Sequence, residues 1–212
     1  MTSTRLPGKV MLPLAGEPVI RHVLRRCKAI PGIDHVIAAI PDHGASKPLA
    51  QEIMAQAVPV YFGPEHDVLA RYRFAALSVK ADVVMRVTAD CPLLDPAVAG
   101  AVLRPVVEGR ADYASNVIPR GFPQGLDCEA FTFAALDAAY HATTEPYDRE
   151  HVTPWLQRNT ELRRVSLAGM GPAVARLRWT LDTEEDYRFL STIFDRLPST
   201  STDFRHVLEL VT

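Results

Sequence analysis

Residues 81–96, ADVVMRVTADCPLLDP, combine an apolar run, an acidic residue at its end and a helix start. The apolar run predicts a buried strand that ends at Asp90, where a Cys-Pro pair turns the chain. Asp95 precedes a proline, which is the usual cap and first-turn pair of a helix, so we assign Asp95 to structure. This stretch therefore predicts a strand, a loop and a helix in that order.

The chain before this stretch repeats the same alternation. Apolar strand patterns occur at 34–41 and 58–62. Helical patterns occur at 17–30, 45–57, 65–79 and 95–109. Such alternation is typical of an α/β fold, a mixed and mainly parallel sheet with helices on both faces. We expect a single domain over residues 1–212.

Beyond residue 118 the pattern changes. A turn-rich segment precedes a second alternating stretch at 126–133. A further strand is predicted at 175–182, followed by a helix at 183–197. In a sheet of this kind ligands bind beyond the carboxyl ends of the strands, so the informative residues should follow each strand.

Composition excludes several classes of function. The 212 residues are 48% hydrophobic and carry a formal net charge of −2, which argues against general nucleic-acid or anionic-membrane binding. No apolar run reaches membrane-spanning length, and the start does not resemble a signal peptide. The three cysteines have neither zinc nor disulfide spacing. We therefore expect a cytoplasmic protein without a membrane or nucleic-acid partner.

Two aspartates end predicted strands. Asp90 is either a turn residue that bonds its own backbone or a carboxylate suited to Mg²⁺, and its position does not decide between them. Asp182 lies just outside a predicted capping box made by Thr183 and Asp186, so it is the better candidate for chemistry.

Further polar residues allow two interpretations. Asp127 and Glu129 would share one strand face, and a solvated edge strand is the default, with a metal or sugar contact as the alternative. Arg149 and His151 could grip an acid or phosphate, although a lone histidine is more often structural.

The N-terminal loop carries two cations around a Leu-Pro-Gly turn. Arg5 offers a planar fork and Lys9 a point charge, while Gly8 permits close backbone approach and Ser3 supplies a hydroxyl. Together they suit a polyphosphate. Alone, the LPGK stretch is better explained by an ordinary turn with exposed cations, and it lacks the Walker pattern.

The ordered set of motifs resembles the cytidylyltransferase family, nearest to its spore-coat polysaccharide biosynthesis protein F type and related to acylneuraminate and deoxy-octulosonate cytidylyltransferases. The motifs are STRLPGK, PLAGEPVI, DVLARY, TADCPLLDP, DYASN, GLDCEAF, REHVTPW and RWTLDTEEDY. The resemblance covers almost the whole chain, and its specificity comes from the order of the motifs.

This resemblance implies a nucleotide-diphospho-sugar transferase fold, and CMP transfer from CTP to an acidic sugar for surface polysaccharide synthesis. It implies that Ser3, Arg5, Gly8 and Lys9 hold the triphosphate and that Arg71 contacts the nucleotide. It further implies the following: Asp90 and Asp182 as Mg²⁺ ligands, Asp127 and Glu129 on the sugar side, and a homodimer formed through an arm near 118–133.

The chain departs from the family at its start. Relatives carry an apolar strand, ending in Ala-Arg, before the position of Met1. That strand would be central, between the strands predicted at 34–41 and 81–90, so we expect a gap there with unpaired backbone groups on both sides. The gap could close, another segment could fill it, or the active protein could begin upstream, which we favour.

Two other functions stay open at this level. One is a glycosyltransferase that uses a ready-made nucleotide sugar, although only the DCE of residues 127–129 approaches its metal motif. The other is an inactive, ligand-binding relative, for which the missing strand is the main support.

Overall fold

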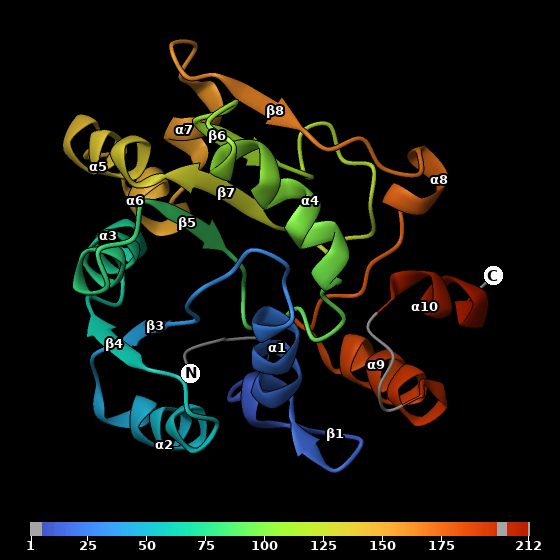
Figure 1. The fold of residues 1–212 in the computed structure, drawn as a ribbon. Helices are drawn as coiled ribbons and strands as arrows, with labels where there is room; N and C mark the ends of the chain where they lie inside the picture. Colours follow the sequence, from blue (N-terminus) through green and yellow to red (C-terminus); the bar gives the residue numbers. More distant parts are fainter. Residues whose placement is uncertain (1–5, 199–202, 212) are drawn as a thin grey trace.

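The computed structural model describes residues 6–198 and 203–211, in which helices and strands alternate as predicted (Figure 1). The strands are β1 (Pro13–Leu14), β2 (Glu17–Pro18), β3 (Ala38–Pro41), β4 (Val60–Gly63), β5 (Val83–Arg86), β6 (Tyr113–Ser115), β7 (Glu129–Thr132) and β8 (Arg164–Ser166). The helices are α1 (Val19–Lys28), α2 (Lys47–Ala55), α3 (Val68–Ser78), α4 (Pro96–Val107), α5 (Phe133–Ala142), α6 (Pro146–His151), α7 (Pro154–Arg158), α8 (Pro172–Ala175), α9 (Glu184–Arg196) and α10 (Phe204–Val211), with 3-10 turns η1 (Lys9–Met11) and η2 (Gly44–Ser46).

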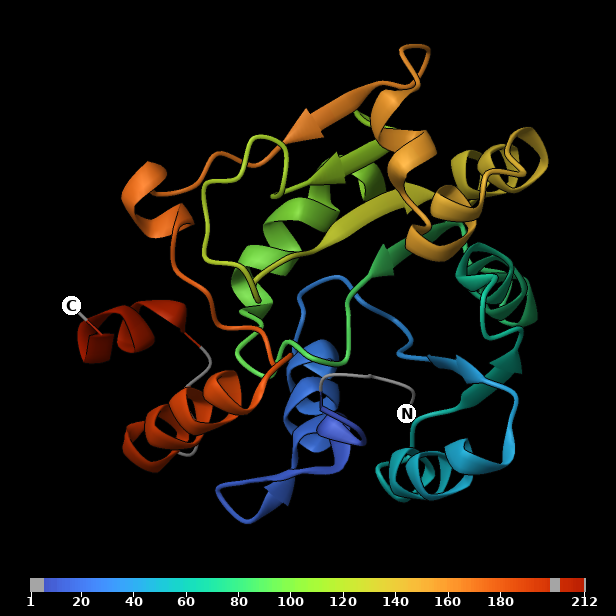
Figure 2. The ribbon, with the colours of Figure 1, turned by 180° about the vertical axis from the view of Figure 1, so that it is seen from behind.

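The strands form separate sheets. β3 and β4 make a parallel pair, and β1 and β2 make a short hairpin. The larger sheet has the order β5-β7-β6-β8, in which β7 is antiparallel to both neighbours and β8 is parallel to β6 (Figure 2). The mixed α/β class predicted from the alternation is therefore confirmed.

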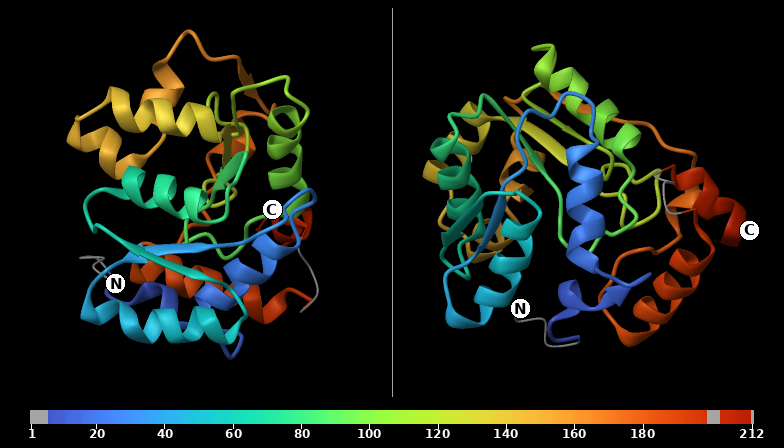
Figure 3. Two further views of the ribbon diagram at one scale, coloured as in Figure 1. Left: turned by 60° about the vertical axis from the view of Figure 1, so that its left-hand side comes forward. Right: turned by 60° about the horizontal axis from the view of Figure 1, so that its bottom comes forward.

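Helices cover both faces of the larger sheet (Figure 3). On β7, Ala130 packs into a cluster with α4, while its neighbour Phe131 packs into a cluster with α3 and α5. Successive side chains of a strand point to opposite faces, so these two residues mark the two layers. The pattern explains why β7 is apolar throughout its centre.

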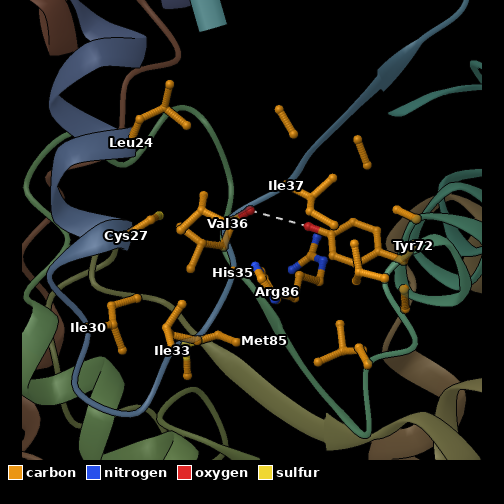
Figure 4. Close-up of a pocket in the computed structure, with 18 of the residues that line it drawn as sticks. Leu24, Cys27, Ile30, Ile33, His35, Val36, Ile37, Tyr72, Met85 and Arg86 are labelled. Atoms are coloured by element: carbon orange, nitrogen blue, oxygen red, sulfur yellow. Dashed lines mark hydrogen bonds between the residues drawn. The ribbon is translucent and has the colours of Figure 1, made fainter. Parts of the chain in front are cut away.

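A cavity of about 1110 Å³ separates β3 from β5. Residues of both strands line it, together with side chains from α1 on one side and α3 on the other (Figure 4). The gap lies where the sequence predicts a missing central strand. The ladder of backbone pairs is consequently interrupted in the middle of the fold.

Two expectations about strands are wrong. Residues 175–182 form no strand, because this extended segment makes only an isolated bridge between Arg178 and Gln124. The stretch around Glu129 is not a solvated edge, since β7 lies between β5 and β6 and Glu129 is only 4% exposed.

Among the described helices, none combines the length and apolar character needed to cross a membrane. The longest, α9, has 13 residues.

Candidate functional site at the carboxyl ends of the strands

The loop at residues 6–12 carries the first charged group of the site. Gly8 adopts φ +69°, a left-handed conformation that glycine takes without strain, and it opens η1. The amide of Met11 donates to the Gly8 carbonyl at 2.8 Å, which closes the turn. The turn presents the Lys9 side chain, while Ser3 and Arg5 lie outside the described residues.

Asp90 follows β5 in a tight turn. The amide of Cys91 donates to the Thr88 carbonyl, and the Cys91 thiol lies 3.2 Å from the Thr88 hydroxyl. Burial raises the pKa of the Cys91 thiol well above its ordinary value, so this cysteine stays protonated and is a poor nucleophile. The turn leaves the Asp90 carboxylate as its reactive group.

Asp182 is positioned by two backbone contacts of the preceding extended segment. Leu181 donates to the Asp90 carbonyl at 2.8 Å, and Trp179 donates to the Gln124 carbonyl at 2.7 Å. Gly125 permits this approach, because a Cβ there would come within 2.7 Å of the Trp179 carbonyl carbon. These bonds, rather than a strand, bring Asp182 beside Asp90.

Lys9 joins the two aspartates. Its ammonium donates to Asp90 Oδ2 at 2.7 Å and to Asp182 Oδ1 at 2.8 Å. Burial lowers the pKa of Lys9, but the charge of Asp90 and hydrogen bonds to both carboxylates outweigh it and raise the pKa overall. Burial raises the pKa of Asp182, but hydrogen bonds from Lys9 and Arg178 more than reverse it. Lys9 and Asp182 are therefore both charged at neutral pH.

Arg178 is a fourth member of this cluster that the sequence reasoning missed. Its Nη2 donates to Asp182 Oδ2 at 2.7 Å and to Asp186 Oδ2 at 3.0 Å. The available signal was the spacing, since Arg178 and Asp182 lie on the same side of an extended segment. Asp182 is thus held between two cations.

The arrangement fits a divalent cation. Two carboxylates from distant parts of the chain already converge on one positive charge, the Lys9 ammonium, at 2.7 and 2.8 Å. Carboxylate oxygens are the ligands that Mg²⁺ prefers, with water and phosphate completing its shell. The described residues contain no group of three or more histidine, cysteine or acidic side chains arranged so that they could hold a metal ion. Asp90 and Asp182 are therefore the pair that could hold the metal.

Arg71 lies at the same end of the fold. It is 8% exposed, packs over Gly63 at the end of β4, and donates to the Glu65 carbonyl at 3.4 Å. Its Nε has no hydrogen-bond partner among the described residues. Burial lowers its pKa, and the guanidinium remains charged at neutral pH.

Glu129 is placed in a buried network. Its carboxylate accepts from Tyr113, from Arg86 at 3.1 Å, from Thr153 just before α7 at 2.9 Å and from Gln157 on α7 at 2.9 Å. Both oxygens are engaged by this chain. The Thr153 hydroxyl therefore bonds Glu129 and does not cap α7, which begins at the next residue.

The other predicted contact residues form pairs of their own. Asp127 pairs with Arg120 at the surface. Arg149 binds the carboxylate of Asp67, which caps α3, and His151 lies exposed on α6. The structure does not bring these residues into the Lys9 cluster.

The predicted helix caps are confirmed. Asp95 accepts from Val98 at 2.9 Å, and Thr183 with Asp186 forms a capping box. Burial raises the pKa of Asp186, but bonds from Arg178 and from two backbone amides, those of Asp182 and Thr183, bring it down to about 2.

Comparison with known proteins identifies the family and the fold. A family model described as cytidylyltransferase matches residues 1–204. A cytidylyltransferase structure from Leptospira borgpetersenii superposes with a TM-score of 0.93 at 28% identity, covering 100% of this chain and 90% of that one.

Two curated relatives extend the comparison. A spore coat polysaccharide biosynthesis protein of Bacillus subtilis is 27% identical, covering 92% of this chain and 83% of its own. A 3-deoxy-manno-octulosonate cytidylyltransferase of Methylorubrum populi is 33% identical, covering 60% of this chain and 52% of its own. With a family model that spans nearly the whole sequence, the chain belongs to the cytidylyltransferase family.

Proposed function

We propose that this protein transfers CMP from CTP to an acidic sugar, releasing pyrophosphate, in the synthesis of a surface polysaccharide. Family membership supports the nucleotidyl transfer. The relatives named for spore coat polysaccharide and for 3-deoxy-manno-octulosonate support the sugar and its acidic character.

One observation carries the proposal: Lys9, Asp90 and Asp182 meet beside the carboxyl ends of β3 and β5. In the sequence, Asp90 lies 81 positions from Lys9 and Asp182 lies 173 positions from it. In open α/β sheets this edge is where ligands bind. A site with two carboxylates and two cations suits a metal-bound polyphosphate better than a neutral ligand.

The chemistry requires charge neutralisation more than covalent catalysis. A sugar oxygen would attack the α-phosphorus in line with the departing pyrophosphate. Mg²⁺, when bound by Asp90 and Asp182, supplies positive charge at the phosphate oxygens. Lys9 and Arg5 would stabilise the charge that develops on the pyrophosphate. Ser3 and Gly8, which belong to the same loop, would help to hold the triphosphate.

Recognition of the two substrates follows from the remaining basic and acidic residues. The buried guanidinium of Arg71 supports a nucleotide contact. The candidates for binding the sugar are Asp127, Glu129, Arg149 and His151, and of these Asp127 and His151 are the most accessible.

We further propose a cytoplasmic homodimer that uses the 118–133 arm, in which half of the Ile118 surface is exposed. Light scattering tests the dimer.

The experiment is a panel of four nucleoside triphosphates against acidic sugars, followed by pyrophosphate release. Release with CTP and one acidic sugar supports the proposal. Nucleotide binding without release under every condition would favour an inactive relative. Activity with a ready-made nucleotide sugar as the donor would instead indicate a glycosyltransferase.

A further inference from the structure

Arg178 connects a carboxylate of the site to a carboxylate of a helix cap. It lies in the segment that joins α8 to α9 (Figure 1), and its side chain is 38% exposed. Nη2 donates to Asp182 Oδ2 at 2.7 Å, while Nε and Nη2 donate to the two oxygens of Asp186 at 3.0 Å each. A guanidinium that binds a carboxylate through two parallel bonds has one defined orientation. Asp186 therefore sets the direction in which Arg178 meets Asp182.

The support behind Arg178 is rigid. Asp186 belongs to the capping box of α9, and its Oδ2 accepts the backbone amides of Asp182 at 2.8 Å and Thr183 at 2.9 Å. The backbone of Arg178 is fixed as well, because it forms a bridge with Gln124. The guanidinium is thus held by a helix start and by a neighbouring segment before any ligand arrives.

The two oxygens of Asp182 face different partners. Oδ2 accepts from Arg178, whereas Oδ1 accepts from the Lys9 ammonium at 2.8 Å. On Asp90, Oδ2 accepts from Lys9 at 2.7 Å, and Oδ1 lies 3.6 Å from the Cys91 thiol, which is only a weak donor. A cation that takes the place of the ammonium therefore meets one oxygen of Asp182, while Arg178 keeps the other.

The number of oxygens that a carboxylate offers separates two common divalent cations. Mg²⁺ is small and requires a near-ideal octahedron, whereas Ca²⁺ is larger, takes more oxygen ligands and accepts carboxylates that bind through both oxygens. A carboxylate restricted to one oxygen favours Mg²⁺. The negative charge of Asp186 offsets the charge of Arg178, so that Asp182 keeps its attraction for a cation.

We propose that Arg178, anchored by Asp186, is a positioning residue that determines which cation the site takes: it holds Asp182 Oδ2, directs Oδ1 toward the position of the Lys9 ammonium, and thereby favours Mg²⁺ over Ca²⁺. Arg178 acts through Asp182 and does not itself touch the cation. The proposal rests on the metal site of the proposed function, but it concerns the choice of metal and is tested without the reaction.

The test measures the affinity for each metal from the rise in melting temperature in MgCl₂ or CaCl₂ alone, with no nucleotide present. Arg178→Gln removes both the charge and the fork. The loss of one positive charge changes the attraction for both divalent cations alike, so the ratio of the two affinities reports the geometry. We expect the ratio of Mg²⁺ to Ca²⁺ affinity to fall about tenfold, because losing a group that orients a metal ligand usually costs at least that much in metal affinity.

Arg163→Gln is the matched control. Arg163 binds Asp112 with a similar fork, at 3.0 and 2.7 Å, and this pair does not belong to the Lys9 cluster. The control should leave the ratio unchanged. Asp186→Asn keeps Arg178 but removes the charge of its anchor, so the ratio should fall in this variant too. Adding Arg178→Gln to Asp186→Asn should lower the ratio no further, since both changes act on one contact.

An unchanged ratio in Arg178→Gln, with a circular dichroism spectrum like that of the wild type, would overturn the proposal. Equal falls in Arg178→Gln and Arg163→Gln would overturn it as well, and so would a wild-type chain that Mg²⁺ does not stabilise. Weaker CTP binding in EDTA with an unchanged ratio would show that Arg178 contacts phosphate instead. A fall confined to the Arg178 and Asp186 variants supports the proposal even if no substrate pair releases pyrophosphate, in which case only the proposed reaction fails.

Discussion

Replacing Lys9 by methionine is the sharpest perturbation of the site. Methionine keeps the length of the side chain but removes the ammonium that bonds Asp90 at 2.7 Å and Asp182 at 2.8 Å. The two carboxylates would then face each other without the ammonium, while Arg178 keeps its bond to Asp182. We expect most CMP transfer to be lost, because in the proposed reaction Lys9 would also stabilise the charge on the triphosphate.

The magnitude for stability follows from burial. Removing one partner of a fully buried ion pair costs about 3–5 kcal/mol. Here the side chains of Lys9, Asp90 and Asp182 keep 15%, 23% and 17% exposure, so water can solvate the carboxylates in part. We therefore expect Lys9→Met to lower the free energy of unfolding by about 2–3 kcal/mol in metal-free buffer.

The assay is urea unfolding with and without Mg²⁺. In the wild type the metal must displace the Lys9 ammonium from Asp90 and Asp182, whereas in Lys9→Met no ammonium competes for these carboxylates. Mg²⁺ should therefore stabilise the variant more than the wild type, since a ligand stabilises in proportion to its affinity for the folded state.

Lys28→Met is the matched control, because the Lys28 ammonium is exposed and, in the described part of the chain, bonds the Gln56 carbonyl and no carboxylate. It should change the free energy of unfolding by less than about 0.5 kcal/mol. The reasoning is refuted if Lys9→Met is as stable as wild type, or if Mg²⁺ shifts both midpoints equally.

Further substitutions separate chemistry from structure. Asp90→Asn and Asp182→Asn should each abolish most pyrophosphate release while leaving the circular dichroism spectrum unchanged. Full activity in either variant would show that the replaced aspartate is not a metal ligand. Asp95→Asn should lower the free energy of unfolding by about 1–2 kcal/mol with turnover intact, because its two oxygens accept separate backbone amides. Glu129→Gln turns an amide toward hydrogen-bond donors, so we expect the free energy of unfolding to fall by about 2–3 kcal/mol, measured by thermal unfolding. An unchanged free energy of unfolding would show that Glu129 acts as a surface residue. The pKa of Asp186 is depressed from 3.8 to about 2. Its ionised carboxylate therefore contributes roughly 2 kcal/mol to the free energy of unfolding above pH 4, and this contribution is lost as the pH falls toward 2. Asp186→Asn should therefore be less stable than wild type at pH 7, and the difference should vanish in acid titration.

Local signals in the sequence were reliable where a short stretch fixes its own geometry. The Asp95 cap and the Thr183 box depend on contacts within three residues, and both occur as predicted. The same holds for the alternation of strands and helices, since it reflects which faces of each element are buried.

Signals that depend on distant partners were weaker. The segment ending in Asp182 alternates like a strand, but its backbone donors go to Gln124 and Asp90 in turn, so no ladder forms. Glu129 was expected on an open face because its partners, Arg86 on β5 and Thr153 before α7, lie 43 and 24 residues away. No pattern within the strand reveals such a network. Arg178 differs, because its spacing of four residues from Asp182 in an extended segment was a local signal that the prediction did not use.

The gap and the site are physically coupled. The loop that carries Lys9 packs through Val10 against the cluster that contains β3, whereas Asp90 follows β5 in the other sheet. The Lys9 ammonium bonds Asp90 at 2.7 Å and so ties the 6–12 loop to the turn after β5. These contacts hold the loop at the strand ends before any ligand binds. Such preorganisation lowers the cost of binding, because less freedom is lost when a ligand arrives.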